Sequence, residues 1–302
     1  MSTLNSDTIN ATSNDMGRRR ALTGALTGFA GLASLAVAGA AQAQNAAPSV
    51  MPAKPLKGKV AIITGARNNQ GRAYAIALAK MGADLVLHYH RAETLDQVQE
   101  TERLVRAEGA RTVLVQGDLG EVANVRRVFD AAQNTYKRAD ILVHTVGLII
   151  KKPMADVTEA DYERSQRANT KSTFFCMAEA GKRLTDNGRI IAIGTSLTAG
   201  AAPGYALYGG TKAPVEEFTR MLAKEIGKRG ITVNCVAPGP LDNSFFHAAE
   251  TPQSAAYAAS LSMVGRLGKE SDITPLVEYL ASAGSQWTTG TTHWVNGGYI
   301  TR

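Results

Sequence analysis

Tyr208 and Lys212, at the two ends of a Tyr-Gly-Gly-Thr-Lys run, are two side chains that could move a proton together. A tyrosine phenol titrates near pH ~10, and an ammonium group close to it favours the phenolate and lowers that pKa. Residues four apart share one face of a helix, so this spacing would hold the two groups side by side. Ser196, twelve residues before Tyr208, would hydrogen-bond the substrate oxygen that gains or loses the proton. The set predicts acid–base chemistry at an oxygen atom, although such a Tyr–Lys pair also occurs by chance on many helices.

The segments around these residues alternate short β-rich runs with amphipathic stretches. Strands that alternate with helices are joined by right-handed crossovers, which produces a parallel sheet covered by helices on both faces. We therefore predict one doubly wound α/β domain over residues 57–302. The predicted strands are Val60–Thr64, Leu85–His88, Thr112–Val115, Ile141–His144, Arg189–Ile193, Thr232–Val236 and Thr292–Val295. The predicted helices lie around Arg72–Met81, Leu95–Ala107, Val122–Thr135, Glu159–Leu184, Leu207–Lys228 and Ile273–Ala283.

A glycine-rich turn, Thr64-Gly65-Ala66-Arg67-Asn68-Asn69-Gln70-Gly71, follows the first predicted strand and opens the first predicted helix. Glycines let a turn approach a pyrophosphate closely, and the helix presents free N–H groups to the anion. Such a turn is a weak signal alone, but here it stands in the required strand–turn–helix context. Asn69 replaces the middle glycine of the usual pattern, so the backbone should approach a phosphate slightly differently there. The turn predicts a dinucleotide site that includes Gly65, Asn69 and Gly71.

The end of the second predicted strand indicates which dinucleotide binds. Enzymes that use NAD often carry an acidic residue there for the ribose hydroxyl, whereas this chain has His88-Tyr89-His90-Arg91. His90 and Arg91, with Arg67 from the glycine turn, would attract a 2′-phosphate. We therefore predict NADP(H) as the cofactor. The alternative is that His90 and Arg91 only begin a solvated helix.

With the glycine turn, Ser196 and Tyr208-x-x-x-Lys212 in register, residues 57–302 resemble the short-chain dehydrogenase/reductase family. The resemblance implies a Rossmann fold, with Tyr208 as the catalytic acid or base. Lys212 would lower the pKa of Tyr208 and hold the nicotinamide ribose. Ser196 would orient the carbonyl oxygen, and Thr195 is its rival because many members separate serine and tyrosine by one residue more. Asn169 would support a water-linked proton relay through the lysine.

The same resemblance implies further contacts with the cofactor. Asp118-Leu119 matches the adenine contact after the third strand, and Pro238-Gly239-Pro240-Leu241 matches the loop that holds the nicotinamide amide. The family's Asn-Asn-Ala-Gly reads His144-Thr145-Val146-Gly147 here, and its usual threonine after the Pro-Gly loop appears as Asn243. A structural role for His144 is favoured over an extra acid or base, because the proton-transfer role is already filled. The predicted cofactor-binding residues are Gly65, Arg67, Asn69, Gly71, His90, Arg91, Asp118, Leu119, Thr145, Gly147, Tyr208, Lys212, Pro238, Gly239 and Leu241.

Together these residues predict an oxidoreductase that transfers hydride between NADP(H) and a carbonyl or alcohol substrate. Substrate choice should lie in Leu241–Met263, whose aromatic residues would suit a hydrophobic or cyclic carbonyl, and Gly147–Met154 should form the opposite rim. The Leu-His-Tyr-His-Arg stretch and Arg67 also resemble pteridine reductases, and the region from Ser196 onward resembles 3-oxoacyl and hydroxynaphthalene-type ketone reductases. A pteridine or imine reductase and a non-catalytic NADP(H)-binding sensor therefore stay open as alternatives.

Composition argues against several other classes. The net charge of +7 is spread over the chain, without the basic stripe and interleaved aromatic residues that nucleic-acid binding requires. Cys176 and Cys235 have neither metal-ligand spacing nor a disulfide framework, and their apolar neighbours predict buried free thiols. We predict no metal site. The family resemblance also implies a homodimer or homotetramer, and an apolar stripe that fits either an interface or the core consists of Val215, Phe218, Leu222 and Ile226.

Residues 1–43 differ from the rest of the chain. Arg18-Arg19-Arg20 precedes an uncharged run, and Ala41-Gln42-Ala43 gives a pattern suited to signal peptidase. The segment resembles a twin-arginine leader, which predicts a periplasmic protein with no stable membrane span once the leader is removed. Residues 44–56, with three prolines, read as a linker. Translation from Met51 would instead give a cytoplasmic enzyme. Because the twin-arginine route exports folded proteins, we expect the cofactor to be loaded before export.

Overall fold

A seven-stranded sheet, in the order β3-β2-β1-β4-β5-β6-β7 and parallel throughout, organises the protein. The structure is a computed structural model in which residues 54–301 are described. The strand order reverses once, at β1 and β4, so the sheet is doubly wound as the alternating sequence pattern predicted. The strands are β1 (Val60–Thr64), β2 (Asp84–Tyr89), β3 (Thr112–Gln116), β4 (Ile141–His144), β5 (Arg189–Ile193), β6 (Thr232–Pro238) and β7 (Thr291–Val295).

Helices cover both faces of this sheet. Apolar side chains of α2, α3 and α11 pack on one face, and those of α4, α6 and α8 pack on the other. Every residue of β1, β4, β5 and β6 is buried, as expected for parallel strands between two helical layers. The helices are α2 (Asn69–Lys80), α3 (Leu95–Ala107), α4 (Val122–Tyr136), α5 (Glu159–Ser165), α6 (Ser172–Arg183), α7 (Ala206–Lys212), α8 (Pro214–Ile226), α9 (Ser244–His247), α10 (Pro252–Leu261) and α11 (Glu270–Ala281).

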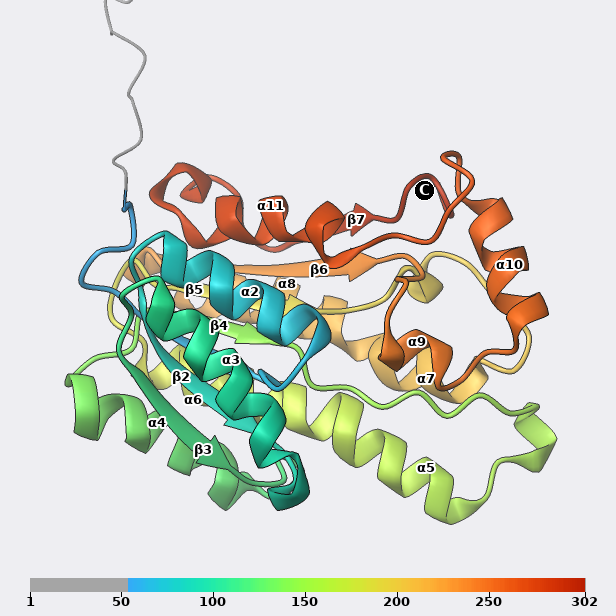
Figure 1. Cartoon of the computed structure of the whole chain (residues 1–302), viewed down its shortest axis with the longest axis horizontal. Coiled ribbons are helices and arrows are strands. Elements are labelled where there is room, and N and C mark those ends of the chain that lie inside the picture. The colour runs from blue at the N-terminus through green and yellow to red at the C-terminus, as the bar shows by residue number, and fades with distance from the viewer. Residues whose placement is uncertain (1–53, 302) are drawn as a thin grey trace, which may run out of the picture. The chain divides into compact units, whose positions relative to one another are not determined.

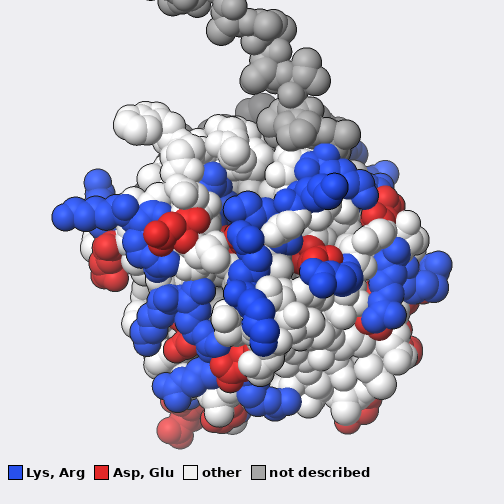
Figure 2. Space-filling view, turned by 90° about the vertical axis from the view of Figure 1, so that its left-hand side faces the viewer, with Lys and Arg blue, Asp and Glu red and all other residues white. Residues whose placement is uncertain are grey.

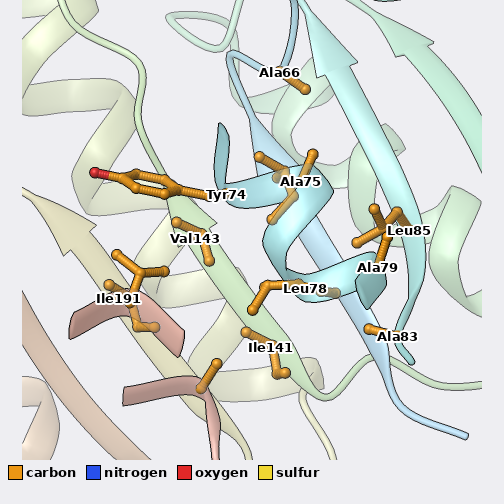
Figure 3. Packing of buried hydrophobic residues seen from close by; sticks show 14 of the residues in the cluster. Ala66, Tyr74, Ala75, Leu78, Ala79, Ala83, Leu85, Ile141, Val143 and Ile191 are labelled. Carbon is orange, nitrogen blue, oxygen red and sulfur yellow. The ribbon is translucent and has the colours of Figure 1, made fainter. Parts of the chain in front are cut away.

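Helix α2 lies close to the sheet because small side chains form much of its inner face. Ala75 and Ala79 are fully buried beside Leu78, and the three face the strands in Figure 3. Ile141 and Val143 of β4 supply the apolar surface on the sheet side. This packing fixes the first turn of α2 relative to the sheet, and with it the glycine-rich turn that precedes the helix.

Two predicted helices are interrupted in the structure. The segment predicted as one helix over Glu159–Leu184 contains a wider π-helical turn at Gln166–Lys171, between α5 and α6. The segment predicted over Leu207–Lys228 divides at Pro214, which begins α8 because a proline lacks the N–H that a helix interior needs. Helices α9 and α10 were not predicted as helices. They form the segment in which the sequence placed substrate choice.

The predicted leader, residues 1–43, lies outside the described residues, as does most of the predicted linker. The last linker residue, Leu56, belongs to the fold: it is buried in the core, and its N–H donates to the carbonyl of Met81 at 2.8 Å. The described residues, 54–301, all belong to one compact unit. Among the described residues, no helix has the length and apolar character needed to cross a membrane.

A buried carboxylate, that of Asp140, ties together the amino ends of the central strands. It accepts hydrogen bonds from the Val60 N–H at 2.9 Å, from Arg138 at 2.6 and 2.8 Å, and from Thr185 at 2.8 Å, with Lys59 at 3.3 Å. Burial alone would raise the pKa of Asp140, but these donors outweigh it and lower the pKa. Figure 2 shows the corresponding face of the molecule, where Lys and Arg side chains predominate and acidic groups lie between them.

We expect Asp140→Asn to destabilise the fold by about 2 kcal/mol, since hydrogen bonds to a charged group each contribute ~1.5–3 kcal/mol. Urea unfolding at pH 7 measures this change. Asp186→Asn is the matched control, because Asp186 pairs with Arg229 in an exposed position and such pairs contribute ~0–1 kcal/mol. Equal effects in the two variants would contradict a structural role for the buried carboxylate.

Candidate active site

A pocket of about 950 Å³ lies at the carboxyl ends of the strands, which is where doubly wound sheets bind their ligands. Most site residues predicted from the sequence line it. They are Gly65, Arg67, Asn69, Gly71, His90, Arg91, Asp118, Thr145, Gly147, Ser196, Tyr208, Lys212, Pro238, Gly239 and Leu241. Two predicted residues do not line it: Asn169 is fully buried beneath the pocket, and Leu119 packs in the core beside α4. The Leu119 side chain therefore cannot contact a ligand in this pocket.

The glycine turn is folded tightly against the start of α2. A Cβ atom added to Gly71 would lie only 2.1 Å from the Gly65 carbonyl oxygen, so no other residue fits there. Asn69 adopts a positive φ of 45°, a left-handed conformation that Asn tolerates better than most residues. Its amide exchanges hydrogen bonds with the Ser244 hydroxyl at 3.0 and 3.2 Å. The replacement of the usual glycine by Asn69 thus adds a bond between the turn and α9.

Basic side chains surround the end of the pocket nearest β2. Arg67 and Arg91 line it with His90, and Arg67 donates a hydrogen bond to Gln97 at 2.8 Å. The carboxylate of Asp118 is bound by the Arg167 guanidinium at 2.7 and 3.0 Å. Burial opposes ionisation of Asp118, but the Gly120 N–H and Arg167 outweigh it and lower the pKa.

These features fit NADP(H). The turn presents backbone to a pyrophosphate, and its glycines allow a close backbone packing that a Cβ atom on Gly65 or Gly71 would prevent. No acidic residue ends β2, and Arg67 and Arg91 are positioned for the planar, charge-assisted contacts that a 2′-phosphate requires. The far end of the pocket holds the Tyr–Lys pair, so one ligand could span both.

Tyr208 and Lys212 lie on α7 and are both buried, at 7% and 2% exposure. The Lys212 ammonium donates to the carbonyl oxygens of Ile193 at 2.8 Å and Val146 at 3.3 Å. Burial raises the pKa of Tyr208 to about 12 and lowers the pKa of Lys212 to about 8. The predicted lowering of the Tyr208 pKa by Lys212 is therefore wrong for this structure, where the pKa is raised. The cost of burying a charged group is the largest cause of both shifts.

Thr195, rather than Ser196, is the hydroxyl beside the phenol. A hydrogen bond between Thr195 and Tyr208 opposes the effect of burial on the phenol pKa. Ser196 also lines the pocket, but it is 1% exposed and its hydroxyl has other partners: it donates to the Ala237 carbonyl at 3.1 Å and accepts from Asn296 at 3.2 Å. The register that places the hydroxyl thirteen residues before the tyrosine is the one the structure favours.

Asn169 lies in the π-helical turn and holds the backbone of the segment after β4. Its side-chain oxygen accepts from the Leu148 N–H at 2.7 Å, and its amide nitrogen donates to the Leu148 carbonyl at 2.9 Å and to Thr211 at 2.9 Å. π-Helical turns are frequent at functional sites. Here the wider turn places the Asn169 amide beside the α7 helix that carries Lys212. The relay role of Asn169 stays a prediction.

His144 is a structural residue, as the sequence favoured. It is fully buried, and its ring nitrogens contact the hydroxyls of Thr64 at 3.1 Å and Ser172 at 3.4 Å. Burial, with a smaller contribution from the Lys212 charge, lowers its pKa well below the usual value. Thr145 follows it and donates through its hydroxyl to the Thr64 carbonyl at 2.6 Å, which ties β4 to β1 beneath the pocket.

Asn243 has a structural explanation where the family pattern has threonine. Its side-chain oxygen caps α9 by accepting from the N–H groups of Phe245 and Phe246, both at 3.1 Å. Its amide nitrogen donates to Glu270 at 2.9 Å. Asn243 therefore starts the helix that covers the pocket.

The sequence missed a polar cluster in the wall opposite the glycine turn. The Glu250 carboxylate, only 4% exposed, accepts from Lys151 at 2.6 Å and from the hydroxyls of Tyr205 and Ser254. Burial would raise the pKa of Glu250, but these donors outweigh it and lower the pKa. Tyr205 precedes Tyr208 by nearly one helical turn, which was a usable signal, whereas nothing near Glu250 in the sequence marked it. The cluster joins the segment after β4 to the segment that carries α9 and α10.

Two aromatic rings contact the Tyr208 ring. The Tyr205 ring lies 6.1 Å from the Tyr208 ring, and the Phe245 ring lies 6.5 Å from it, both in edge-to-face geometry. Tyr257 and Tyr299 also line the pocket. Of the predicted apolar stripe on α8, Val215 is a core residue and the others pack against the core.

Neither cysteine belongs to the site. Cys176 and Cys235 are free and buried, as predicted, and burial raises the pKa of both thiols. Within residues 54–301, no group of three or more His, Cys, Asp or Glu side chains is placed to hold a metal ion.

Comparison with known proteins places residues 65–300 in a family described as enoyl-(acyl carrier protein) reductase. The chain is 38% identical over 261 residues to the NADPH-dependent aldehyde reductase-like protein of Arabidopsis thaliana chloroplasts, covering 82% of this chain and 97% of that one. A structure from Burkholderia cenocepacia with bound NADP shares 39% identity and a TM-score of 0.79, covering 83% and 97% of the two chains. The angucycline C-6 ketoreductase LanV with bound NADP shares 31% identity and a TM-score of 0.76, covering 81% and 96%.

We expect Glu250→Gln to loosen the cover formed by residues 244–261. The change removes the charge that Lys151 requires while keeping the side-chain size, and each ~1.4 kcal/mol lost allows tenfold more opening. Hydrogen–deuterium exchange of residues 244–261 should therefore be roughly tenfold faster in the variant. Glu100→Gln, which breaks the exposed pair with Arg103, is the control and should leave that exchange unchanged. Unchanged exchange in Glu250→Gln would show that the cluster does not hold the cover.

Proposed function

The chain belongs to the short-chain dehydrogenase/reductase family, and from this premise we propose that it is a carbonyl reductase in which Tyr208 is the acid/base. It is an NADP-dependent oxidoreductase, since three of its structural relatives contain bound NADP or NADPH and a relative 38% identical in sequence is named an NADPH-dependent reductase-like protein. The observation that carries the proposal is the arrangement of Tyr208, Thr195 and Lys212 at one end of a pocket whose other end fits the 2′-phosphate of the cofactor.

In the reducing direction, the bound cofactor supplies the hydride to the carbonyl carbon. The phenol of Tyr208 gives its proton to the carbonyl oxygen, and the high pKa of the phenol keeps that proton in place at neutral pH. The Thr195 hydroxyl, which lies beside Tyr208, would hydrogen-bond the same oxygen as negative charge develops on it. The two carbonyl oxygens that accept hydrogen bonds from Lys212 hold its ammonium group in place near this centre.

The pocket favours a cyclic or aromatic ketone as the substrate class. Tyr205 and Phe245 flank Tyr208 with ring edges and faces, and the Tyr205 ring is fixed by its hydroxyl bond to Glu250. Flat apolar rings pack well against such walls. The similarity to the angucycline C-6 ketoreductase supports this class. A pteridine or imine reductase and a non-catalytic NADP(H) sensor are the alternatives.

We expect Tyr208→Phe to lower carbonyl reduction at least about a hundredfold, because general acid catalysis contributes ~10²–10⁴ in rate. NADPH binding should remain within about twofold of the original. A screen of aromatic ketones, quinones, pterins, imines and alcohols that follows NADPH absorbance identifies the substrate, and the variant is then measured on it.

Thr195→Ala and Ser196→Ala form a matched pair for the second hydroxyl. Loss of a donor to a developing oxyanion costs ~10²–10³ in kcat, so Thr195→Ala should lose most of its turnover and Ser196→Ala much less. The opposite order would restore Ser196 as the substrate-orienting residue. Full activity in Tyr208→Phe would refute the mechanism, and no turnover with any carbonyl would favour one of the alternatives.

Export and self-association are further proposals. The order of basic, apolar and cleavage-site segments in residues 1–43 supports a twin-arginine leader, and exposed Phe174 and Met221 on α6 and α8 support a homo-oligomer. Native mass spectrometry of protein from the periplasmic fraction tests both: we expect a chain cleaved after Ala43, in dimers or tetramers. A cytoplasmic protein that begins near Met51 would overturn export, and a monomer would overturn association.

A further inference from the structure

His88 is a buried polar side chain beneath the cofactor end of the pocket, and the reaction proposed above makes no use of it. It is 1% exposed and lies one residue before the end of β2, after the apolar run Leu85, Val86 and Leu87. An imidazole in such a place requires hydrogen-bond partners for both ring nitrogens. Those partners identify what the residue does.

Each nitrogen of His88 bonds a different backbone segment. Nε2 lies 2.8 Å from the Gly117 carbonyl oxygen, and Nδ1 lies 3.2 Å from the Gly65 nitrogen. A carbonyl oxygen only accepts, so Nε2 carries the proton and Nδ1 accepts from the Gly65 N–H. These two bonds require the neutral ring in one tautomer.

The electrostatic surroundings also favour the neutral ring. Burial lowers the pKa of His88 to about 4, with a smaller contribution from His90, while the Gly117 bond and Asp118 act in the opposite direction. His144 is the other titratable group that faces it. His88 therefore stays neutral, and both bonds persist, at neutral pH.

The same two segments are also attached to the backbone at the end of β2. The Ala66 N–H donates to the His88 carbonyl at 2.8 Å, and the Gly117 N–H donates to the Tyr89 carbonyl at 3.0 Å. Gly65 begins the phosphate-binding turn, and Gly117 immediately precedes Asp118 on the other side of the pocket. The imidazole thus connects two walls of the pocket from below, without reaching its surface.

We propose that His88 is a positioning residue for the adenosine half of NADP(H). Its ring sets the spacing between the turn after β1 and the loop after β3, so that the two walls receive the adenosine and its phosphates at once. Without the ring, the Gly65 N–H and the Gly117 carbonyl lose their buried partner, and the two walls are free to shift. The inference rests on NADP(H) as the cofactor and needs no knowledge of the carbonyl substrate.

The test is calorimetric binding of two probes, adenosine 2′,5′-bisphosphate and NADP⁺, at pH 7.5. We expect His88→Leu, which removes both bonds, to raise the Kd of each probe at least about tenfold. His88→Asn, whose amide oxygen can accept from the Gly65 N–H, should recover part of the affinity. His144→Asn is the matched control: it alters the other buried strand-end histidine, which bonds Thr64 and Ser172, and should leave bisphosphate binding within about twofold.

Three results would overturn the proposal. Bisphosphate binding within twofold of the original in folded His88→Leu would exclude a positioning role. An equal loss in His144→Asn would show a general effect on the sheet. If His88→Leu does not fold, the affinities of His88→Asn and His88→Gln for the bisphosphate test the proposal instead. Unchanged affinity in both variants, or failure of both to fold, would show that His88 serves only the stability of the fold. Both probes measure binding and not turnover. If the protein reduced no carbonyl, the proposed function would be refuted, but the binding test of His88 would still be valid.

Discussion

The rest of the site depends on one energetically costly feature, the burial of the Lys212 ammonium with no carboxylate among its hydrogen-bond acceptors in residues 54–301. Two carbonyl oxygens hold it, and burial lowers its pKa to about 8. Its side chain fills the space beside Gly147, where an added Cβ would lie 3.2 Å from the ammonium nitrogen. A side chain at Gly147 would therefore force Lys212 or Asn169 to shift by a few tenths of an ångström, and glycine lets the backbone after β4 pass close by without that shift.

Asn169 serves the same arrangement from the other side. Its amide fixes the Leu148 backbone, and its oxygen would lie 3.3 Å from a Cβ on Gly147. A regular α-helix over residues 159–184 would place this side chain differently, and the π-helical turn at Gln166–Lys171 supplies the extra width. The π-helical turn is thus explained by the position that the Asn169 side chain must take.

Sequence patterns predicted the sheet, because strands that are buried on both faces must be apolar along their length and the helices between them must be amphipathic. Both patterns can be recognised in short stretches of sequence. They also placed Tyr208, Lys212 and the glycine turn in one pocket, since the carboxyl ends of parallel strands converge. They favoured Ser196 and left Thr195 as its rival, because one residue of register decides which hydroxyl faces Tyr208 and spacing does not fix that register. They missed Glu250, whose partners Lys151 and Tyr205 lie 99 and 45 residues away, and they overestimated the effect of Lys212 on Tyr208 because burial cannot be read from spacing.

The Asp140 cluster and the pocket occupy opposite ends of the same strands. Val60 begins β1 at the cluster, and Thr64 ends it beneath the pocket. The side chains that stabilise the sheet at its amino end are therefore largely different from the side chains that line the pocket at its carboxyl end. During divergence, residues around Tyr205 and Phe245 can be exchanged while the stabilising network stays intact. Because the two regions are separate, proteins with this fold can acquire new substrates through changes in the pocket without losing the ability to fold.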